Sequence, residues 1–248
     1  MKVLAVDVGG TNVKILATGQ TERRRFPSGR KLTAEQMVAG VKKLAADWQY
    51  DVVSVGFPGP VLHGRPINDP PNLGKGWVGF DFQKAFGCPV KVINDAAMQA
   101  LGSYQGGRML FLGLGTGLGS AMVIDGDIEP MELGHLPYRR RTYEDYVGLR
   151  GIRRYGRKKW RRYVKDVVER FVKALEPTEV ILGGGNTKLL KALPPRCSAG
   201  ANANAFVGGF RLWGETAGEK PASPAKPIPS VRRVNGPEVK SKAQAAGA

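Results

Sequence analysis

Short apolar runs alternate along the chain with longer segments in which apolar residues recur at helical spacing. The apolar runs, most of which stop at a glycine or at an acidic or amide residue, predict buried strands at residues 2–8, 13–17, 51–56, 90–93, 109–113, 119–124 and 179–182. The helical spacing predicts helices at residues 33–48, 96–101, 157–175 and 202–213. We therefore expect an α/β fold, in which strands and helices share the core.

Local signals mark the ends of some elements and leave others open. Thr33 and Gln36 fit a capping box at the start of the first helix, and Pro177 stops the third. Residues 20–30 are polar and basic, which indicates an exposed edge or loop. Residues 68–81 show little periodicity. They form either an ordinary surface excursion, which their composition favours, or a rim that faces a sugar.

The stretch at residues 90–102 is the centre of the pattern. A strand ends at Asn94-Asp95 and a helix follows, which places Asp95 at the carboxyl end of a strand and at a helix N-cap. In open α/β sheets that edge faces the ligand crevice. An Asp in this place, taken alone, most often only caps its helix.

Glycine-rich turns on both sides of this stretch change that interpretation. Residues 9–12 connect two strands and residues 113–119 connect two more, so both are hairpins and neither matches a P-loop. Glycine lets backbone N–H groups approach phosphate oxygens, so one carboxylate between two such loops indicates phosphoryl transfer. A third glycine run, at residues 183–185, either meets a nucleotide or phosphate or allows close packing.

Composition narrows the class of protein. The chain has 248 residues, of which 42% are hydrophobic, and its apolar runs are too short to span a bilayer. The N-terminus reaches Asp7 too early for a signal peptide. Two cysteines form no cluster and imply no disulfide framework. We therefore expect a cytoplasmic protein with reduced thiols and no membrane partner.

The charge is high and unevenly distributed. The formal net charge is +17, and residues 139–173 hold 14 Lys or Arg against 4 Asp or Glu, a net charge of +10. Such a charge attracts polyanions. The basic residues early in the third helix form either a solvated face or a track for polyphosphate; they are Arg157, Lys158, Lys159, Arg161 and Arg162.

A few polar residues and the C-terminal segment complete the pattern. His135 follows Glu132 in a glycine-bearing turn, and this pair is either a hydrogen-bonded structural group or a polar ligand contact. Glu144 is either a solvated carboxylate at a helix start or a second ligand carboxylate. Residues 219–248 contain five prolines and no aromatic residue, so we expect a disordered tail.

Taken together, these motifs resemble the ROK family of sugar kinases and repressors, within the hexokinase–actin superfamily, and among them the bacterial polyphosphate glucokinases. The matching stretches are D-V-G-G-T-N-V-K (7–14), P-G-P (58–60), N-L-G-K-G-W (72–77), I-N-D-A (93–96), L-G-L-G-T-G-L-G-S-A (112–121), E-L-G-H (132–135), Y-E-D-Y-V-G (143–148), L-G-G-G-N (182–186) and N-A-N-A-F-V-G-G-F-R-L-W (202–213). They occur in one order over about residues 1–215, so the set is more specific than any single motif.

The resemblance implies a fold and a reaction. The fold would be two actin-like, ribonuclease-H-like α/β domains whose mixed sheets flank a cleft. Residues 1–105, completed by a C-terminal helix at 202–215, would form the smaller domain, and residues 106–201 the larger one. The reaction would be an Mg-dependent phosphoryl transfer to the 6-hydroxyl of a hexose, and the family pattern further implies a homodimer.

The resemblance also implies roles for matched positions. Asp95 matches the catalytic base, which orients the hydroxyl and takes its proton. The matches to sugar-binding positions are Asn72, Asn94, Glu132, His135 and Glu144. The matches to the first phosphate loop and to the acid near the metal and phosphate are Gly9, Gly10, Thr11, Asn12, Lys14 and Asp7. The matches to the second phosphate loop are Gly115, Thr116 and Gly117, and those to the stretch that meets adenosine are Gly183, Gly184 and Gly185.

One interval departs from the wider family. Many ROK proteins carry a C-x-C-G-x-x-G-C zinc motif between E-x-G-H and the later Glu, whereas residues 136–143 here read L-P-Y-R-R-R-T-Y. We therefore expect no structural zinc, as in the polyphosphate glucokinases. No helix-turn-helix precedes Val3, which argues against a repressor.

We thus expect a glucokinase whose phosphoryl donor is inorganic polyphosphate, with ATP as a further donor. An ATP-only glucokinase, in which the positive charge is incidental, is the nearest alternative. A rival of another class is a non-catalytic, sugar-responsive polyanion binder. The intact base and phosphate loops disfavour it, and we expect no nucleic-acid partner.

Overall fold

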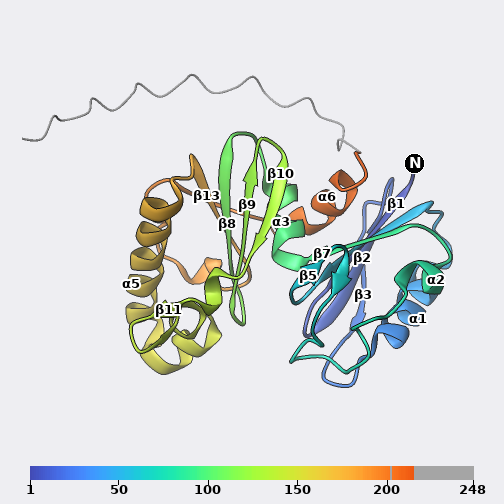
Figure 1. The fold of residues 1–248 in the computed structure, drawn as a ribbon, viewed down its shortest axis with the longest axis horizontal. Helices are drawn as coiled ribbons and strands as arrows, with labels where there is room; N and C mark the ends of the chain where they lie inside the picture. Colours follow the sequence, from blue (N-terminus) through green and yellow to red (C-terminus); the bar gives the residue numbers. More distant parts are fainter. Residues whose placement is uncertain (202, 215–248) are drawn as a thin grey trace, which may run out of the picture.

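The computed structural model describes residues 1–201 and 203–214 of the chain, which form two α/β lobes with α3 and α6 between them (Figure 1). The elements of the first half of the chain are β1 Val3–Val8, β2 Asn12–Ala17, β3 Arg24–Pro27, α1 Ala34–Leu44, β4 Val52–Phe57, β5 Val61–Leu62, β6 Arg65–Pro66, α2 Phe82–Phe86, β7 Val90–Asn94 and α3 Asp95–Ser103. Those of the second half are β8 Arg108–Leu114, β9 Leu118–Ile124, β10 Asp127–Met131, β11 Pro137–Tyr138, β12 Arg141–Thr142, α4 Tyr143–Val147, α5 Leu149–Leu175, β13 Glu179–Gly183, β14 Cys197–Ala199 and α6 Asn204–Arg211.

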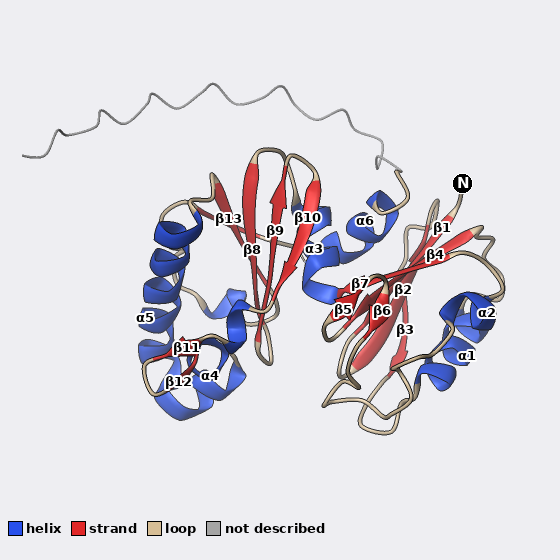
Figure 2. Cartoon of the chain, in the orientation of Figure 1, coloured by secondary structure: helices blue, strands red, loops and turns tan. Residues whose placement is uncertain are grey.

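Each lobe is built on a five-stranded mixed sheet, and the two sheets have the same design (Figure 2). The strand orders are β3-β2-β1-β4-β7 and β10-β9-β8-β13-β14. In each sheet, three strands that are consecutive in the sequence form an antiparallel meander. Two later strands continue the sheet beyond the first strand of the meander, and both run parallel to that strand. The expected α/β class with two mixed sheets is confirmed.

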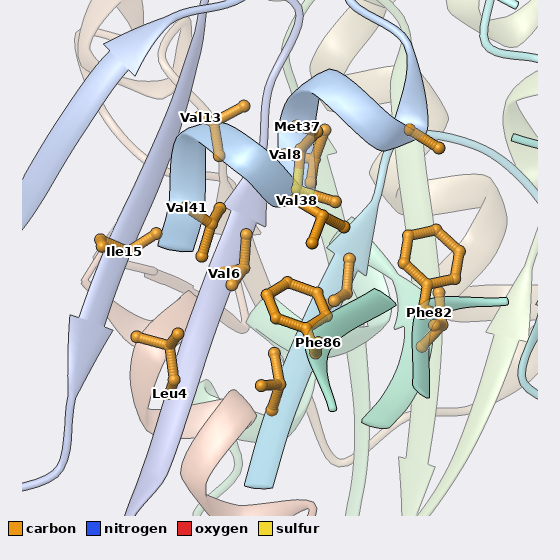
Figure 3. Packing of buried hydrophobic residues seen from close by; sticks show 14 of the residues in the cluster. Leu4, Val6, Val8, Val13, Ile15, Met37, Val38, Val41, Phe82 and Phe86 are labelled. Atoms are coloured by element: carbon orange, nitrogen blue, oxygen red, sulfur yellow. The ribbon is translucent and has the colours of Figure 1, made fainter. Parts of the chain in front are cut away.

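The first core lies between its sheet and the helices α1 and α2. Figure 3 shows Val6 and Val8 of β1 facing Met37 and Val41 of α1, with Phe86 of α2 beside them. The alternation of apolar residues along β2 buries every second side chain, as expected for a half-covered strand. The central strands β1 and β4 are buried throughout, since both of their faces are covered.

The start of α1 follows the sequence signal. Thr33 Oγ1 accepts a hydrogen bond from the backbone N–H of Gln36 at 3.2 Å, and Gln36 Oε1 accepts one from the N–H of Thr33 at 3.1 Å. The capping box is therefore confirmed. The helix ends at Leu44 and not near Trp48, whose ring is nevertheless buried in the same core.

The basic helix α5 consists of two helical segments that meet at Gly156, whose φ of 72° and ψ of 161° are not helical. The segment after Gly156 is the helix expected from Arg157 onward, and the segment from Leu149 to the break was not expected. Glycine has no Cβ and adopts these φ and ψ angles without strain, so the helix breaks at a residue that tolerates the break. The Nε1–H of Trp160 donates to the carbonyl of Val147 at 2.7 Å inside the core, which ties α5 to α4.

Small residues let α3 approach both the second sheet and α6. Three alanines of α3, Ala96, Ala97 and Ala100, lie in a cluster with residues of β8 and β9. On another side α3 meets α6 so closely that a Cβ on Gly102 would stand 1.8 Å from the carbonyl oxygen of Asn204. A Cβ on Gly208 would stand 1.8 Å from the carbonyl oxygen of Met98. Glycine at these two positions is a packing requirement.

Other differences from the expected elements are at edges and ends. Arg24–Pro27 forms the edge strand β3, which resolves the open choice for residues 20–30. The strand β14 at Cys197–Ala199 was not expected, because three residues carry little periodicity. The last helix spans Asn204–Arg211. The expected disordered tail, residues 219–248, lies outside the described residues. No helix of the described chain is both long and apolar enough to cross a membrane.

Candidate functional site

A cleft of about 620 Å³ lies between the lobes, where loops from both sheets meet. Its walls come from the ends of β4, β7, β8 and β13, which are the carboxyl ends of parallel strands. Many of the residues expected from the sequence line it: Gly10, Asn72, Asn94, Asp95, Gly115, Thr116, Gly117, Glu132, His135, Glu144 and Gly184. Segments up to 174 residues apart in the chain are therefore brought to one place.

Asp95 is the first residue of α3 and lines this cleft. The N-cap is Asn94, whose Oδ1 accepts hydrogen bonds from the N–H groups of Ala96 and Ala97 at 2.9 and 3.1 Å. The expectation that Asp95 occupies the N-cap was therefore wrong. Asn94 Nδ2 also donates to the carbonyl of Gly59 at 3.0 Å, which leaves only one amide hydrogen of Asn94 for a ligand.

The surroundings of Asp95 favour its protonated form. Burial, followed by the charges of Asp7 and Glu132, raises the pKa of Asp95 to about 7, against the opposing effect of a hydrogen bond from the N–H of Ala96. A carboxyl with a pKa near neutrality can hold or release a proton at physiological pH, which suits a general base. The influence of Asp7 also shows that two carboxylates lie near each other at this end of the first sheet.

Hydrogen bonds hold the first glycine loop, residues 9–12, in place. Gly9 donates its N–H to the carbonyl of Asn12 at 3.1 Å, and the Ser28 hydroxyl donates to the carbonyl of Gly9 at 2.6 Å. Of the four loop residues 9–12, Gly10 lines the cleft, whereas Gly9, Thr11 and Asn12 do not. Asp7 and Lys14, also outside the cleft lining, form an ion pair of 2.8 Å between neighbouring strands.

The second glycine loop, between β8 and β9, is held by two distant segments. Asn186 Nδ2 donates to the carbonyl of Gly115 at 2.8 Å, and the N–H of Leu149 donates to the carbonyls of Gly115 and Thr116 at 3.1 Å each. Gly184 has a φ of +83°, and a Cβ there would stand 2.5 Å from the Leu114 carbonyl oxygen. Gly184 is therefore required for close packing, and since it also lines the cleft, a ligand contact of the third glycine run stays a prediction.

A polar wall forms on the side of the second lobe. Glu132 precedes the 3₁₀ turn Leu133–His135, His135 is its last residue, and Glu144 lies in the first turn of α4. His135 Nδ1 is 3.6 Å from Glu132 Oε2. Burial raises the pKa of Glu132, the charge of His135 lowers it, and the charge of Glu144 raises it. Two carboxylates and an imidazole in one wall can bind several hydroxyl groups of one ligand.

The rim opposite this wall comes from residues 68–72, which line the cleft. The segment is therefore not the ordinary surface excursion that its composition favoured. It is fixed from behind, because Asp69 Oδ1 accepts a hydrogen bond from the N–H of Trp77 at 2.9 Å and the Trp77 ring is fully buried. Sequence reasoning missed Asn68, Asp69 and Gln99 as cleft residues, since no short motif marks them.

The remaining expected residues lie away from the cleft. Gly183 is buried at the end of β13, and Gly185 lines a second cavity next to the first. The five basic residues expected to contact a donor, Arg157 to Arg162 without Trp160, are on α5 and do not line the cleft. The basic run is therefore not part of the wall around Asp95.

One residue near Asp95, Asp7, has the chemistry to help hold a magnesium ion. Mg²⁺ is usually bound by one or two protein carboxylates together with substrate phosphates and water. Asp7 supplies a carboxylate whose charge acts on Asp95, near two glycine loops that could hold phosphates, and this carboxylate is ion-paired with Lys14 at 2.8 Å. Over residues 1–201 and 203–214, no group of three or more His, Cys, Asp or Glu side chains is arranged to hold a metal ion by itself.

Replacing Asp95 by asparagine is expected to stabilise the fold by an amount that grows with pH. The pKa is about 7 in the folded chain against an ordinary value of 3.8, so the folded state binds the proton more tightly and wild-type stability falls as pH rises between those values. That difference corresponds to about 4 kcal/mol. Because the side chain still contacts cleft water, we expect a gain of about 2 kcal/mol at pH 8.

Thermal unfolding of both proteins across this pH range measures the effect. The gain should be small near pH 4 and should level off above pH 7. The Asp125→Asn variant removes an exposed carboxylate from the turn between β9 and β10 and should show no such pH dependence. A gain for the Asp95 variant that is equal at pH 4 and pH 8 would contradict the raised pKa.

Comparisons with known proteins identify related sequences and folds. A family model described as the ROK family matches residues 3–144. A polyphosphate glucokinase of Mycobacterium tuberculosis is 27% identical over 208 residues, which are 73% of this chain and 76% of that protein. A bifunctional NanE/NanK enzyme of Brucella melitensis is 32% identical over 141 residues, but these span 50% of this chain and only 27% of that enzyme.

Two solved structures illustrate the likeness in fold. The inorganic polyphosphate/ATP-glucomannokinase of Arthrobacter sp. strain KM is 27% identical, with a TM-score of 0.69 over 84% of this chain and 96% of that chain. A ROK family glucokinase of Streptomyces griseus, solved with glucose and AMPPNP, has a TM-score of 0.72 over 86% of this chain and 99% of that chain. Its identity of 17% supports the fold alone.

Proposed function

This chain belongs to the ROK family, and we propose that it is a glucokinase that transfers a phosphoryl group from inorganic polyphosphate to the 6-hydroxyl of glucose. Two relatives whose names include polyphosphate as a donor support the choice, each at 27% identity and over most of both chains. The high positive charge of the second lobe supports it further, since polyphosphate is a polyanion.

The observation that carries the proposal is the position of Asp95. Its carboxyl lines the cleft between two glycine loops from different sheets and has a pKa near 7. Phosphoryl transfer needs phosphate-binding loops and a group that accepts a hydroxyl proton. Helix capping does not explain the position of Asp95, because Asn94 is the residue that caps the helix.

Glucose would bind between the polar wall and the rim. In this proposal Glu132, Glu144 and His135 contact ring hydroxyls from one side, and Asn72 contacts them from the other. Carboxylates accept hydrogen bonds from hydroxyls, and the amide can donate as well as accept. Several such contacts orient the ring, and orientation lowers the barrier by removing rotational freedom before the reaction.

Asp95 would then act on the 6-hydroxyl. Its deprotonated carboxylate accepts the hydroxyl proton as the hydroxyl oxygen bonds to the terminal phosphorus, and the bond from that phosphorus to the bridging oxygen breaks. The products are glucose 6-phosphate and a polyphosphate shortened by one unit. Mg²⁺ would be held by Asp7 together with the donor phosphates, and it would supply neutralisation of charge on the phosphoryl oxygens.

ATP is the donor in the second candidate function. The cavity lined by Gly184 and Gly185 adjoins the cleft and offers room for a nucleoside. Glucose 6-phosphate formation by the purified chain with Mg²⁺ and either nucleotide-free polyphosphate or ATP separates the candidates. Turnover with polyphosphate is the expected result. Turnover with ATP alone would leave a sugar kinase with another donor, and no product with either donor would favour the binding-protein alternative.

A further inference from the structure

A second cavity, of about 440 Å³, adjoins the active-site cleft, and Gly184 lines both. Its walls come from the segment between β13 and β14, which includes the 3₁₀ turn Thr187–Leu189. Two lysines of this segment, Lys188 and Lys191, line the cavity and are exposed. A ligand longer than the cleft could therefore continue past Gly184 into a basic space.

The basic helix α5 contacts the 3₁₀ turn that forms part of the wall of the second cavity. Arg161 Nε donates a hydrogen bond to the carbonyl of Leu189 at 2.7 Å, which fixes one side of α5 against the 3₁₀ turn. Residues three and four apart share a helix side, so Arg157 and Lys158 lie on the side of Arg161. Lys159, by the same geometry, points to another side. Part of the basic run thus lies beside the turn that carries Lys188, although its residues do not line the second cavity itself.

This positive charge is not balanced by nearby acids. In the described part of the chain, no carboxylate lies within ion-pair distance of Lys188, Lys191, Arg157 or Lys158, whereas Lys165, further along α5, is 3.8 Å from Glu169. Residues 180–200 contain no Asp or Glu. Unpaired cations at a concave surface attract polyanions strongly, because field lines concentrate there.

We propose that the second cavity is a subsite for the distal phosphates of the donor, held by Lys188 and Lys191 and continued by Arg157 and Lys158 on α5. The inference rests on the proposed function and names the part of the donor that this region binds. No aromatic ring lines the cavity, so it offers no stacking platform for a base, while its lysines suit successive phosphate groups. Long polyphosphate would use both cavities, and tripolyphosphate would use only the cleft.

The test compares donor chain lengths in a double variant, Lys188→Ala/Lys191→Ala. The KM for long-chain polyphosphate should rise at least about fivefold and should depend less on salt, because two charge contacts are lost. Turnover with tripolyphosphate and the KM for glucose should stay unchanged. The Lys188→Arg/Lys191→Arg variant should keep a KM near that of the wild type, since the charge is preserved.

A control variant, Lys43→Ala/Lys173→Ala, removes two exposed charges from α1 and from the far end of α5. An equal rise of KM in this control would show a general charge effect and would overturn the subsite. An equal rise for tripolyphosphate and long chains would overturn it as well. If the wild type uses polyphosphate but the double variant keeps the wild-type KM for long-chain polyphosphate, the subsite proposal is wrong while the proposed function stands. If the wild type uses only ATP, the donor assignment and the subsite fail together.

Discussion

Replacing Asp95 by asparagine is expected to lower kcat at least about 100-fold while the Kd for glucose changes less than about threefold. The amide keeps the size of the carboxyl but cannot accept the hydroxyl proton in the transition state. The glucose contacts proposed for Glu132, Glu144 and Asn72 come from other segments, so binding should persist. The helix should also persist, since the N-cap is Asn94.

Steady-state kinetics with saturating polyphosphate and calorimetric titration with glucose measure the two quantities separately. The Asp125→Asn variant removes the same charge from an exposed turn and should keep wild-type kcat and binding. A kcat within tenfold of the wild type would remove Asp95 from the role of base. Loss of glucose binding together with kcat would instead assign Asp95 to sugar binding.

Replacing Gly208 by alanine is expected to destabilise the fold by at least about 3 kcal/mol, at the upper end of overpacking costs. The added Cβ would stand 1.8 Å from the carbonyl oxygen of Met98 and 2.9 Å from the backbone nitrogen of Gly102. Backbone atoms of a packed helix cannot move aside as a flexible side chain does. The helices α3 and α6 must therefore separate, and each is packed against further elements.

Chemical denaturation of the variant measures this loss. The Gly185→Ala variant is the stability control, because no atom lies within 4 Å of a Cβ at that position and its φ is not positive. It should change the free energy of unfolding by less than about 0.5 kcal/mol. Equal stability of the Gly208 variant and the wild type would show that the close crossing of α3 and α6 is wrong. Since α3 begins at Asp95, the variant should also lose activity in proportion to the displacement of that helix.

Local sequence signals determined much of the fold because they depend on a few neighbouring residues. The capping box of Thr33 and Gln36 needs only one turn of helix, and the structure contains it. The strand pattern needs only alternation or continuous apolarity, and it located the first two strands of each meander but not the edge strands β3 and β10. The segment before Gly156 illustrates the limit: the pattern predicted the helix from Arg157 onward and missed the helical residues that precede the break.

Only the tertiary structure decided which residues meet. Asn72, Asp95, Glu132 and Gly184 come from four separate segments, and their common cleft depends on how two sheets and α3 pack. The same holds for Asn186, which braces the second loop from 71 residues away. The sequence by itself determined the α/β class, the glycine loops and the acid between them, since those signals are local. The walls of the cleft, the raised pKa of Asp95 and the basic second cavity arise from contacts between distant segments, so only the packed chain shows them.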